Sequence, residues 1–179
     1  MPTAYISIGS NLGDRLEHLK EAVKRIRQSK AIEITKASFV YETQPVYGER
    51  SRTIEYTAQP RFLNMVMELK TTLEPLNLLE LLLGIENQMG RTRNRRYGPR
   101  NIDLDLLLCN DLVLNSDKLT LPHPRMHERR FVLVPLTEIA PKVVHPLLKK
   151  SVERLLEELS ADSASKKDEF EVRVYPQKI

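Results

Sequence analysis

The spacing of hydrophobic residues along the first 108 residues alternates between the two-residue period of a strand and the longer period of a helix. The predicted order is strand, helix, strand, strand, helix, strand. The six segments are residues 4–8, 16–26, 32–42, 62–71, 76–90 and 102–108. This order predicts an α/β (α+β) fold, a ferredoxin-like βαββαβ sandwich with C-terminal additions.

The expected helix ends carry ordinary capping signals. Asp14, followed three residues later by Glu17, resembles a capping box, and Pro75 and Gly90 suit the first turn and the end of the second helix. The string GSNLG after the first strand lacks the Lys-Ser/Thr ending of a phosphate-binding loop, so we interpret it as a turn. A long irregular connection over residues 43–61 is of the length that is usually functional.

The chain after the sixth segment adds several smaller elements. We expect one domain over residues 1–160 and a C-terminal tail over residues 161–179, in which EFEVRVY can form an extra edge strand or pair with another subunit. The elements expected before the tail are a hairpin at 110–120, a loop at 122–130, an apolar strand or helix at 131–141 and a helix at 151–159.

Positive charge is concentrated in one short run. The chain of 179 residues carries a net charge of +4, and residues 91–100 (RTRNRRYGPR) contain five arginines and no acid. Without that run, 23 basic face 24 acidic side chains, a net charge of −1. Proteins that coat nucleic acid usually spread lysine and arginine over a whole face. The distribution therefore favours a focused anion site.

The single cysteine, Cys109, excludes an internal disulfide, and Met1 runs almost directly into a strand-like segment. Both features predict a cytoplasmic protein. Its longest apolar stretch, residues 78–85, is interrupted by Glu80 and too short for a bilayer, so we expect no membrane role.

Asp103 and Asp105 follow the arginine run and alternate with Ile102, Leu104 and Leu106. This spacing points both carboxylates to one face of a strand. Two same-face carboxylates repel unless a cation lies between them, and clustered arginines repel unless an anion does. A magnesium-bound polyphosphate satisfies both groups. Taken separately, the strand also fits a half-exposed edge, and the arginine run fits a solvated or nucleic-acid-binding loop.

Five strings are more specific than these patterns: IGSNLG, RFLN, GR-x-R…R-Y-GPR-x-IDLD, LPHPRMHERRFVL and PLTEIAP. Together, from about Ala4 to Pro146, they resemble the 6-hydroxymethyl-7,8-dihydropterin pyrophosphokinases of folate biosynthesis. The resemblance implies an enzyme that transfers the β,γ-pyrophosphoryl group of ATP to the pterin hydroxymethyl oxygen and releases AMP. The GPR-x-IDLD core carries most of the specificity, because no general physical need dictates it.

The resemblance also implies roles for individual residues on the phosphate side. Asp103 and Asp105 would hold two Mg²⁺ ions, and Arg91, Arg93 and Arg100 would neutralise charge on the transferred group. The nucleotide would be bound by Glu86, Lys118, Thr120, His123 and Arg129. From the residues alone, Glu86 also suits a surface ion pair and His123 an exposed loop position.

On the pterin side, Phe62 and Asn64 share one strand face, while Leu63, Met65 and Met67 face the opposite way. The resemblance implies that the pterin is bound by Thr43, Val46, Phe62, Asn64, Tyr97 and Phe131, with Tyr97 replacing the tryptophan usual in the family. The alternatives are core packing for the two phenylalanines and a local backbone hydrogen bond for Asn64.

Two other functions stay open at this level. One is an RNA-binding module that uses the arginine run for backbone contacts, and the other is a different magnesium-dependent nucleotidyl or phosphoryl transferase. For the favoured function we expect ATP and a pterin alcohol as partners, neither nucleic acid nor membrane, and a monomer or weak homodimer.

Overall fold

The computed structural model describes residues 1–45, 59–90, 98–162, 171–177 and 179. In these ranges the main sheet has six strands, ordered β5-β1-β4-β3-β8, with β2 also paired to β4. Every neighbouring pair is antiparallel. The strands are β1 (Thr3–Ser10), β2 (Ile32–Ala37), β3 (Tyr41–Thr43), β4 (Phe62–Thr71), β5 (Asp103–Cys109) and β8 (Val172–Val174).

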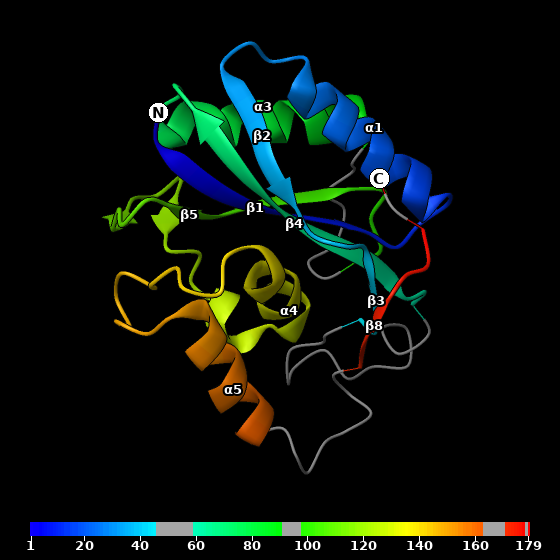
Figure 1. Ribbon diagram of the computed structural model, residues 1–179. Helices are drawn as coiled ribbons and strands as arrows, with labels where there is room; N and C mark the ends of the chain where they lie inside the picture. Colours follow the sequence, from blue (N-terminus) through cyan, green and yellow to red (C-terminus); the bar gives the residue numbers. More distant parts are fainter. Residues whose placement is uncertain (46–58, 91–97, 163–170, 178) are drawn as a thin grey trace.

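Helices cover both faces of this sheet (Figure 1). On one face lie α1 (Arg15–Arg27) and α3 (Pro75–Gln88), and on the other lie α4 (Arg130–Ile139) and α5 (Val152–Asp162). The predicted helix ends are confirmed: the Asp14 side chain accepts the Glu17 N–H at 3.1 Å, and Pro75 occupies the first turn of α3. Gly90 follows α3 with a φ of +78°, a conformation that favours glycine.

Two hydrophobic cores result from the alternation of side chains across the sheet. The first lies under α1 and α3 and includes the predicted inward residues Leu63, Met65 and Met67 of β4. The second lies under α4 and α5 and includes Tyr5 and Val66 of the sheet. The helices α4 and α5 cover only part of their face of the sheet. Towards the end of the sheet, the same face carries the polar or small residues Ser7, Gly9, Asn64, Asp103 and Asp105.

Two expected segments differ in detail from the structure. The strand expected over residues 32–42 is divided into β2 and β3, because the chain leaves the ladder at Ser38, whose hydroxyl accepts the Val66 N–H at 3.0 Å in place of a backbone carbonyl. The segment 131–141, for which strand and helix were both open, forms α4 even though Pro135 lies inside it.

The remaining elements are short. The predicted hairpin is confirmed as β6 (Leu114–Asn115) and β7 (Thr120–Leu121), and a 3₁₀ turn, η2 (Met126–Glu128), lies within the segment predicted as a loop. Across the part of the chain described here, no helix is both long enough and apolar enough to span a membrane.

Candidate active site

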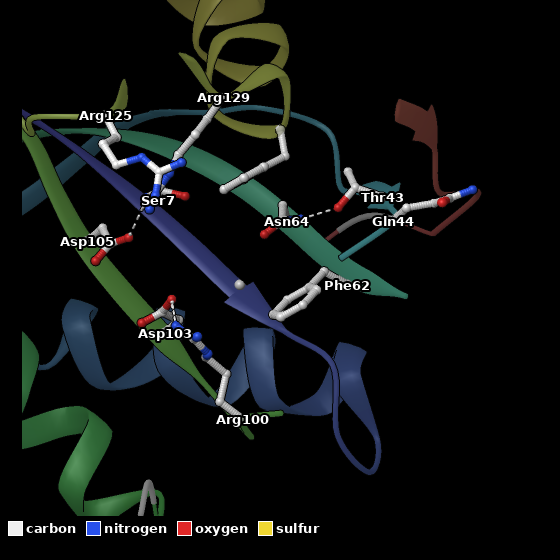
Figure 2. Close-up of a pocket in the computed structure, with 12 residues that line it drawn as sticks. Ser7, Thr43, Gln44, Phe62, Asn64, Arg100, Asp103, Asp105, Arg125 and Arg129 are labelled. Atoms are coloured by element: carbon white, nitrogen blue, oxygen red, sulfur yellow. Dashed lines mark hydrogen bonds and ion pairs between the residues drawn. The ribbon is translucent and has the colours of Figure 1, made fainter. Parts of the chain in front are cut away.

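A cleft opens over the end of the sheet that α4 and α5 leave uncovered (Figure 2). The strands β1, β3, β4 and β5 form its floor, and the start of α4 with the turn before it forms one wall. The lining residues are Ser7, Gly9, Thr43, Gln44, Phe62, Asn64, Arg100, Asp103, Asp105, Arg125, Arg129 and Phe131. Eight of the twelve residues expected to bind ligand or metal that lie in the described ranges therefore lie in one place.

The predicted acid pair lies at one end of this cleft. Asp103 and Asp105 both line it, which confirms that they share one face of β5. Each acid has its own arginine: Arg100 Nη1 donates to Asp103 Oδ2 at 2.5 Å, and Arg129 Nη1 lies 3.6 Å from Asp105 Oδ2. The site thus has two anionic and two cationic groups within contact of one another, an arrangement suited to a metal ion with phosphates.

Negative charge at Asp105 is disfavoured in this setting. Burial and the neighbouring Asp103 raise the pKa of Asp105 to about 6, with a further contribution from Glu86, although Arg129 acts in the opposite direction. A carboxylate with a raised pKa beside a second carboxylate gains stability from a bound cation. The electrostatics of the pair therefore fit a metal ligand.

Glu86 is buried at the end of α3, with 1% of its surface exposed, so the alternative of a surface ion pair is wrong. Its Oε1 accepts the backbone N–H of Leu104 at 2.7 Å. Leu104 separates the two acids on β5. Glu86 therefore holds the strand at the point where Asp103 and Asp105 project into the cleft.

The last arginine of the basic run is held by the turn after β1. The Asn11 N–H donates to the Arg100 carbonyl at 3.1 Å, and Asn11 Oδ1 accepts the Arg100 N–H at 2.8 Å. The Asn11 amide also donates to Gln59 Oε1 and to the Pro60 carbonyl. The IGSN string thus includes a residue that positions Arg100 beside the acids.

Asn64 lies at the other end of the cleft floor and is 4% exposed. Its Nδ2 donates to Thr43 Oγ1 at 2.7 Å, so the expected alternative of a local backbone hydrogen bond is wrong. This bond leaves Oδ1 on the side of Gly9, where an added Cβ would lie 2.6 Å from it. Among the described residues no donor is bonded to that oxygen, which leaves it available to a ligand N–H.

Two aromatic rings flank this amide end. Phe62 and Phe131 are half-buried and line the cleft, and Phe131 also packs against the second core. The Arg129 guanidinium lies over the Phe131 ring, 5.5 Å from its centroid. Core packing, the alternative for both phenylalanines, is therefore only part of the environment of Phe131. The rings and the amide together suit a flat, polar heterocycle.

His123 is half-buried, with its Nε2 3.5 Å from Arg129 Nη1, so the alternative of an exposed loop position is wrong. Burial and the positive charge of Arg129 lower the pKa of His123 to about 4, so the ring is neutral at pH 7. Its Nδ1 accepts the Arg125 N–H at 3.2 Å, which assigns the ring proton to Nε2. Arginine only donates, so with this tautomer Nε2–H and Arg129 Nη1, 3.5 Å apart, are two donors that face each other, and a ligand oxygen can accept from both.

Several predicted residues lie outside the cleft or outside the described ranges. Lys118 and Thr120 belong to the β6–β7 hairpin and do not line the cleft. Val46, Arg91, Arg93 and Tyr97 are outside the described residues.

The described ranges also contain no group of three or more His, Cys, Asp or Glu residues placed to hold a metal. The acid pair alone is nevertheless enough for magnesium, which commonly takes one or two carboxylates together with substrate phosphates.

Four lining residues were missed at the level of the sequence: Ser7, Gly9, Gln44 and Arg125. Ser7 and Gly9 are small or polar residues at alternate positions of β1, which indicates that they share one face of the strand. This spacing does not show which face of a buried strand lines the site. The pairing does: Gly9 is opposite Asn64 on one side and Asp103 on the other.

The fold and site together define a class of protein. It is an antiparallel α/β protein with helices on both faces of its sheet and one open end. The paired acids, each with an arginine, suit a metal-bound polyphosphate, and the amide and rings beside them suit a planar ring.

Comparison with known proteins gives the particular family. The family model of the 7,8-dihydro-6-hydroxymethylpterin-pyrophosphokinases (HPPK) matches residues 5–141. The chain belongs to this family. It is 50% identical over 140 residues to the 2-amino-4-hydroxy-6-hydroxymethyldihydropteridine pyrophosphokinase of Bacillus subtilis, covering 78% of this chain and 79% of the relative. The corresponding Haemophilus influenzae enzyme is 42% identical over 146 residues, covering 82% and 86%.

Solved structures show the same fold. A Plasmodium falciparum HPPK-DHPS structure with pteroate matches 95% of this chain with a TM-score of 0.72 at 15% identity. An HPPK-DHPS structure in complex with substrates matches 92% of this chain with a TM-score of 0.69 at 16% identity. The chain spans 46% and 44% of those longer proteins. At such identities the likeness concerns the fold alone.

Proposed function

We propose that this protein transfers the pyrophosphoryl group of ATP to the hydroxymethyl oxygen of 6-hydroxymethyl-7,8-dihydropterin, giving the pterin diphosphate and AMP for folate biosynthesis. Membership of the HPPK family supports this reaction. The chemistry of the cleft supports it independently, because one end suits a polyphosphate and the other a flat heterocycle.

One observation carries the assignment of the two substrates to the two ends. Asn64, Gly9 and Asp103 are direct neighbours across β4, β1 and β5. Adjacent strands are about 4.8 Å apart, so the amide and the acid are separated by about 10 Å across a residue with no side chain. That spacing accommodates a pterin ring at Asn64 with its hydroxymethyl arm directed towards phosphates at the acids.

For the metal, we propose that Asp103 and Asp105 hold the two Mg²⁺ ions expected for the family. The raised pKa of Asp105 and the paired carboxylate donors fit such a ligand set. Bound magnesium supplies positive charge that neutralises the triphosphate.

The residues of the chain then position the reactants. Asn64 Oδ1 accepts an N–H of the pterin, its amide being oriented by Thr43, while Phe62 and Phe131 hold the ring between them. On the other side, Arg100 and Arg129 contact the phosphates, with His123 Nε2 as an additional donor.

In the proposed reaction the pterin alcohol oxygen forms a bond to the β-phosphorus, the bond from that phosphorus to the α–β bridging oxygen breaks, AMP leaves and the alcohol proton passes to solvent. The role of the protein is to orient the two substrates and to stabilise charge on the leaving oxygen. Four further residues lie outside the described ranges. Of these, we propose that Arg91 and Arg93 contact the phosphates and that Val46 and Tyr97 contact the pterin. Glu86, Lys118 and Thr120 stay proposals for the nucleotide side.

Further proposals concern the topology of the fold, the location of the protein and its oligomeric state. The order β5-β1-β4 with β2 and β3 beside β4 supports a ferredoxin-like core over residues 1–160, extended by a tail over residues 161–179. A cytoplasmic location and a monomer or weak homodimer are proposals that rest on the sequence. The family assignment favours this enzyme over an RNA-binding module and over another transferase.

The experiment that tests the reaction is identification of the nucleotide product. The protein is incubated with ATP, Mg²⁺ and 6-hydroxymethyl-7,8-dihydropterin, and the nucleotides are separated. We expect AMP to form only when the pterin is present. Pterin-dependent ADP would show transfer of the γ-phosphoryl group instead, and folded protein without turnover would remove the proposed function.

A further inference from the structure

The C-terminal strand β8 lies at the edge of the sheet beside β3 (Figure 1). β3 carries Thr43, which lines the end of the cleft proposed for the pterin. It is far beyond residue 141, where the match to the family model ends. We propose that β8 and Glu171 before it are positioning elements for the pterin: they hold β3 and the start of β4, and so fix Thr43 and Phe62. This inference rests on the proposed function, because it names the pterin as the ligand affected.

The first support is the pairing of β8 with β3. β3 has only three residues, and β8 pairs with all of them, Thr43 lying opposite Val172. Just beyond the ladder, the Tyr175 N–H donates to the Val40 carbonyl at 2.8 Å, and the Tyr175 side chain packs against the first core. Without β8, the strand that carries Thr43 would be a three-residue edge strand, held in the sheet by β4 alone.

The second support is an ion pair that joins the tail to the entrance of β4. Glu171 Oε2 lies 3.1 Å from Arg61 Nη1, and the two side chains are 29% and 37% exposed. Glu171 also pairs with Arg173 of β8. Arg61 precedes Phe62 directly, so the tail is tied to the residue next to a proposed pterin contact.

The ion pair continues into the body of the protein. The Arg61 carbonyl accepts a hydrogen bond from Arg15 Nη1 at 2.7 Å, and the same Arg15 nitrogen donates to Glu42 Oε1 at 2.9 Å. Glu42 is the middle residue of β3, next to Thr43. A chain of contacts therefore runs from α1 through β3 and β4 to the tail, along the segments that carry Thr43 and Phe62.

The location of these contacts predicts selectivity between the two substrates. β3 and β8 are at one edge of the sheet, whereas Asp103 and Asp105 are on β5 at the opposite edge, with β4 and β1 between them. Loosening the tail should therefore disturb the pterin end and leave the phosphate end intact. A general loss of stability would affect both substrates alike.

The test compares steady-state kinetics of the full-length protein with three variants: Glu171→Gln, Arg61→Gln and the double variant. We expect each single change to raise the KM for pterin about three- to ten-fold, with the KM for ATP, kcat and Tm close to the parent values. The double variant should have a KM for pterin close to that of each single variant, because either single change already removes the Arg61–Glu171 ion pair. Glu158→Gln is the matched control. Glu158 lies on α5, away from the cleft, and forms comparable ion pairs with Lys150 and with Arg154.

A second variant that ends at Asp162 removes β8 altogether and should raise the KM for pterin further than Glu171→Gln does. If the truncated chain fails to fold, the KM values of the point variants test the proposal on their own. Equal effects on both substrates, additive effects of the two point changes, or an unchanged KM for pterin would each overturn the inference. Absence of turnover in the parent protein would instead refute the proposed function. In that case, amide hydrogen exchange over residues 41–43 still tests the positioning role, because exchange must rise in Glu171→Gln.

Discussion

At the scale of single residues, the site depends on one position where an added side chain would force its neighbour to move. Gly9 lies between Asn64 and Asp103 across the sheet, and a Cβ there would be 2.6 Å from Asn64 Oδ1, well inside van der Waals contact. The oxygen in question is the group that we assign to the pterin. The absence of a side chain at residue 9 therefore determines the shape of the pterin end.

We predict that Gly9→Ala displaces the Asn64 amide, breaks its bond to Thr43 and raises the KM for pterin at least about ten-fold. The KM for ATP should change much less. Gly84→Ala is the control, because a Cβ at Gly84 in α3 meets nothing within 4 Å and alanine there should stabilise the helix by about 0.5–1 kcal/mol. A Gly9→Ala variant with the parent KM for pterin would contradict the assignment of Asn64.

A second prediction at this scale concerns Asp105. Asp105→Asn should reduce turnover about 10²-fold or more, because it removes a proposed magnesium ligand. The Tm of the ligand-free protein should stay the same or rise, since the change removes repulsion from Asp103 and Glu86. Thermal unfolding and turnover at saturating Mg²⁺ measure the two effects. Near-normal turnover would exclude Asp105 as a ligand.

At the scale of secondary-structure elements, one carboxylate joins three strands on the same face of the sheet as the cleft, but further along β4 from it. Glu68 of β4 accepts hydrogen bonds from Tyr5 Oη at 2.9 Å, Thr35 Oγ1 at 2.8 Å and Lys36 Nζ at 3.1 Å. Burial alone would raise the pKa of Glu68, but these three partners lower it below its usual value. In return, burial and the bond to Glu68 raise the pKa of Tyr5. The ionised Glu68 thus holds β1 and β2 against β4.

Glu68→Gln should therefore lower the free energy of unfolding at pH 7 by about 1–3 kcal/mol. A lowered pKa in the folded state gives stability that is present above the unfolded pKa and is lost as pH falls through the folded value. The difference between parent and variant should accordingly shrink as the pH falls below about 4.5. Denaturant unfolding at pH 7 and at acid pH measures this. A difference independent of pH would mean that the charge of Glu68 is unimportant.

At the scale of the whole molecule, the arrangement of layers creates the site. The helices α1 and α3 pack on one face of the sheet, while α4 and α5 cover part of the other (Figure 1). The uncovered part is where β1, β4 and β5 present polar residues. Bound substrate would complete this second layer, so ligands should stabilise the fold as a whole.

We expect a nonhydrolysable ATP analogue with Mg²⁺ to stabilise the protein by about 2.7 kcal/mol at 100 times its Kd. For a chain of this length that corresponds to a rise in Tm of about 5–10 °C. Asp105→Asn should lose most of the shift. An RNA oligonucleotide should give none at physiological salt. Stabilisation by the oligonucleotide but not by the nucleotide analogue would favour the RNA-binding alternative.

The sequence alone determined the features that depend on neighbours in the chain. The strand and helix periods gave the order of elements through β5, apart from the division of residues 32–42 into β2 and β3, and the spacing of Asp103 and Asp105 placed both on one face. The caps at Asp14 and Pro75 are equally local. The GPR-x-IDLD string identified the family because so specific a string is dictated by function and not by folding.

Only the tertiary structure decided the features that depend on residues far apart in the chain. Asn11 holds Arg100 across 89 residues, Glu86 binds the strand between the acids, and Gly9 faces Asn64 through strand pairing. Residues 131–141 were predicted as either strand or helix. They form α4, which packs on the second core. A local pattern specifies which side chains share a face, but not which face meets the cleft, because that depends on the strands and helices that pack beside it.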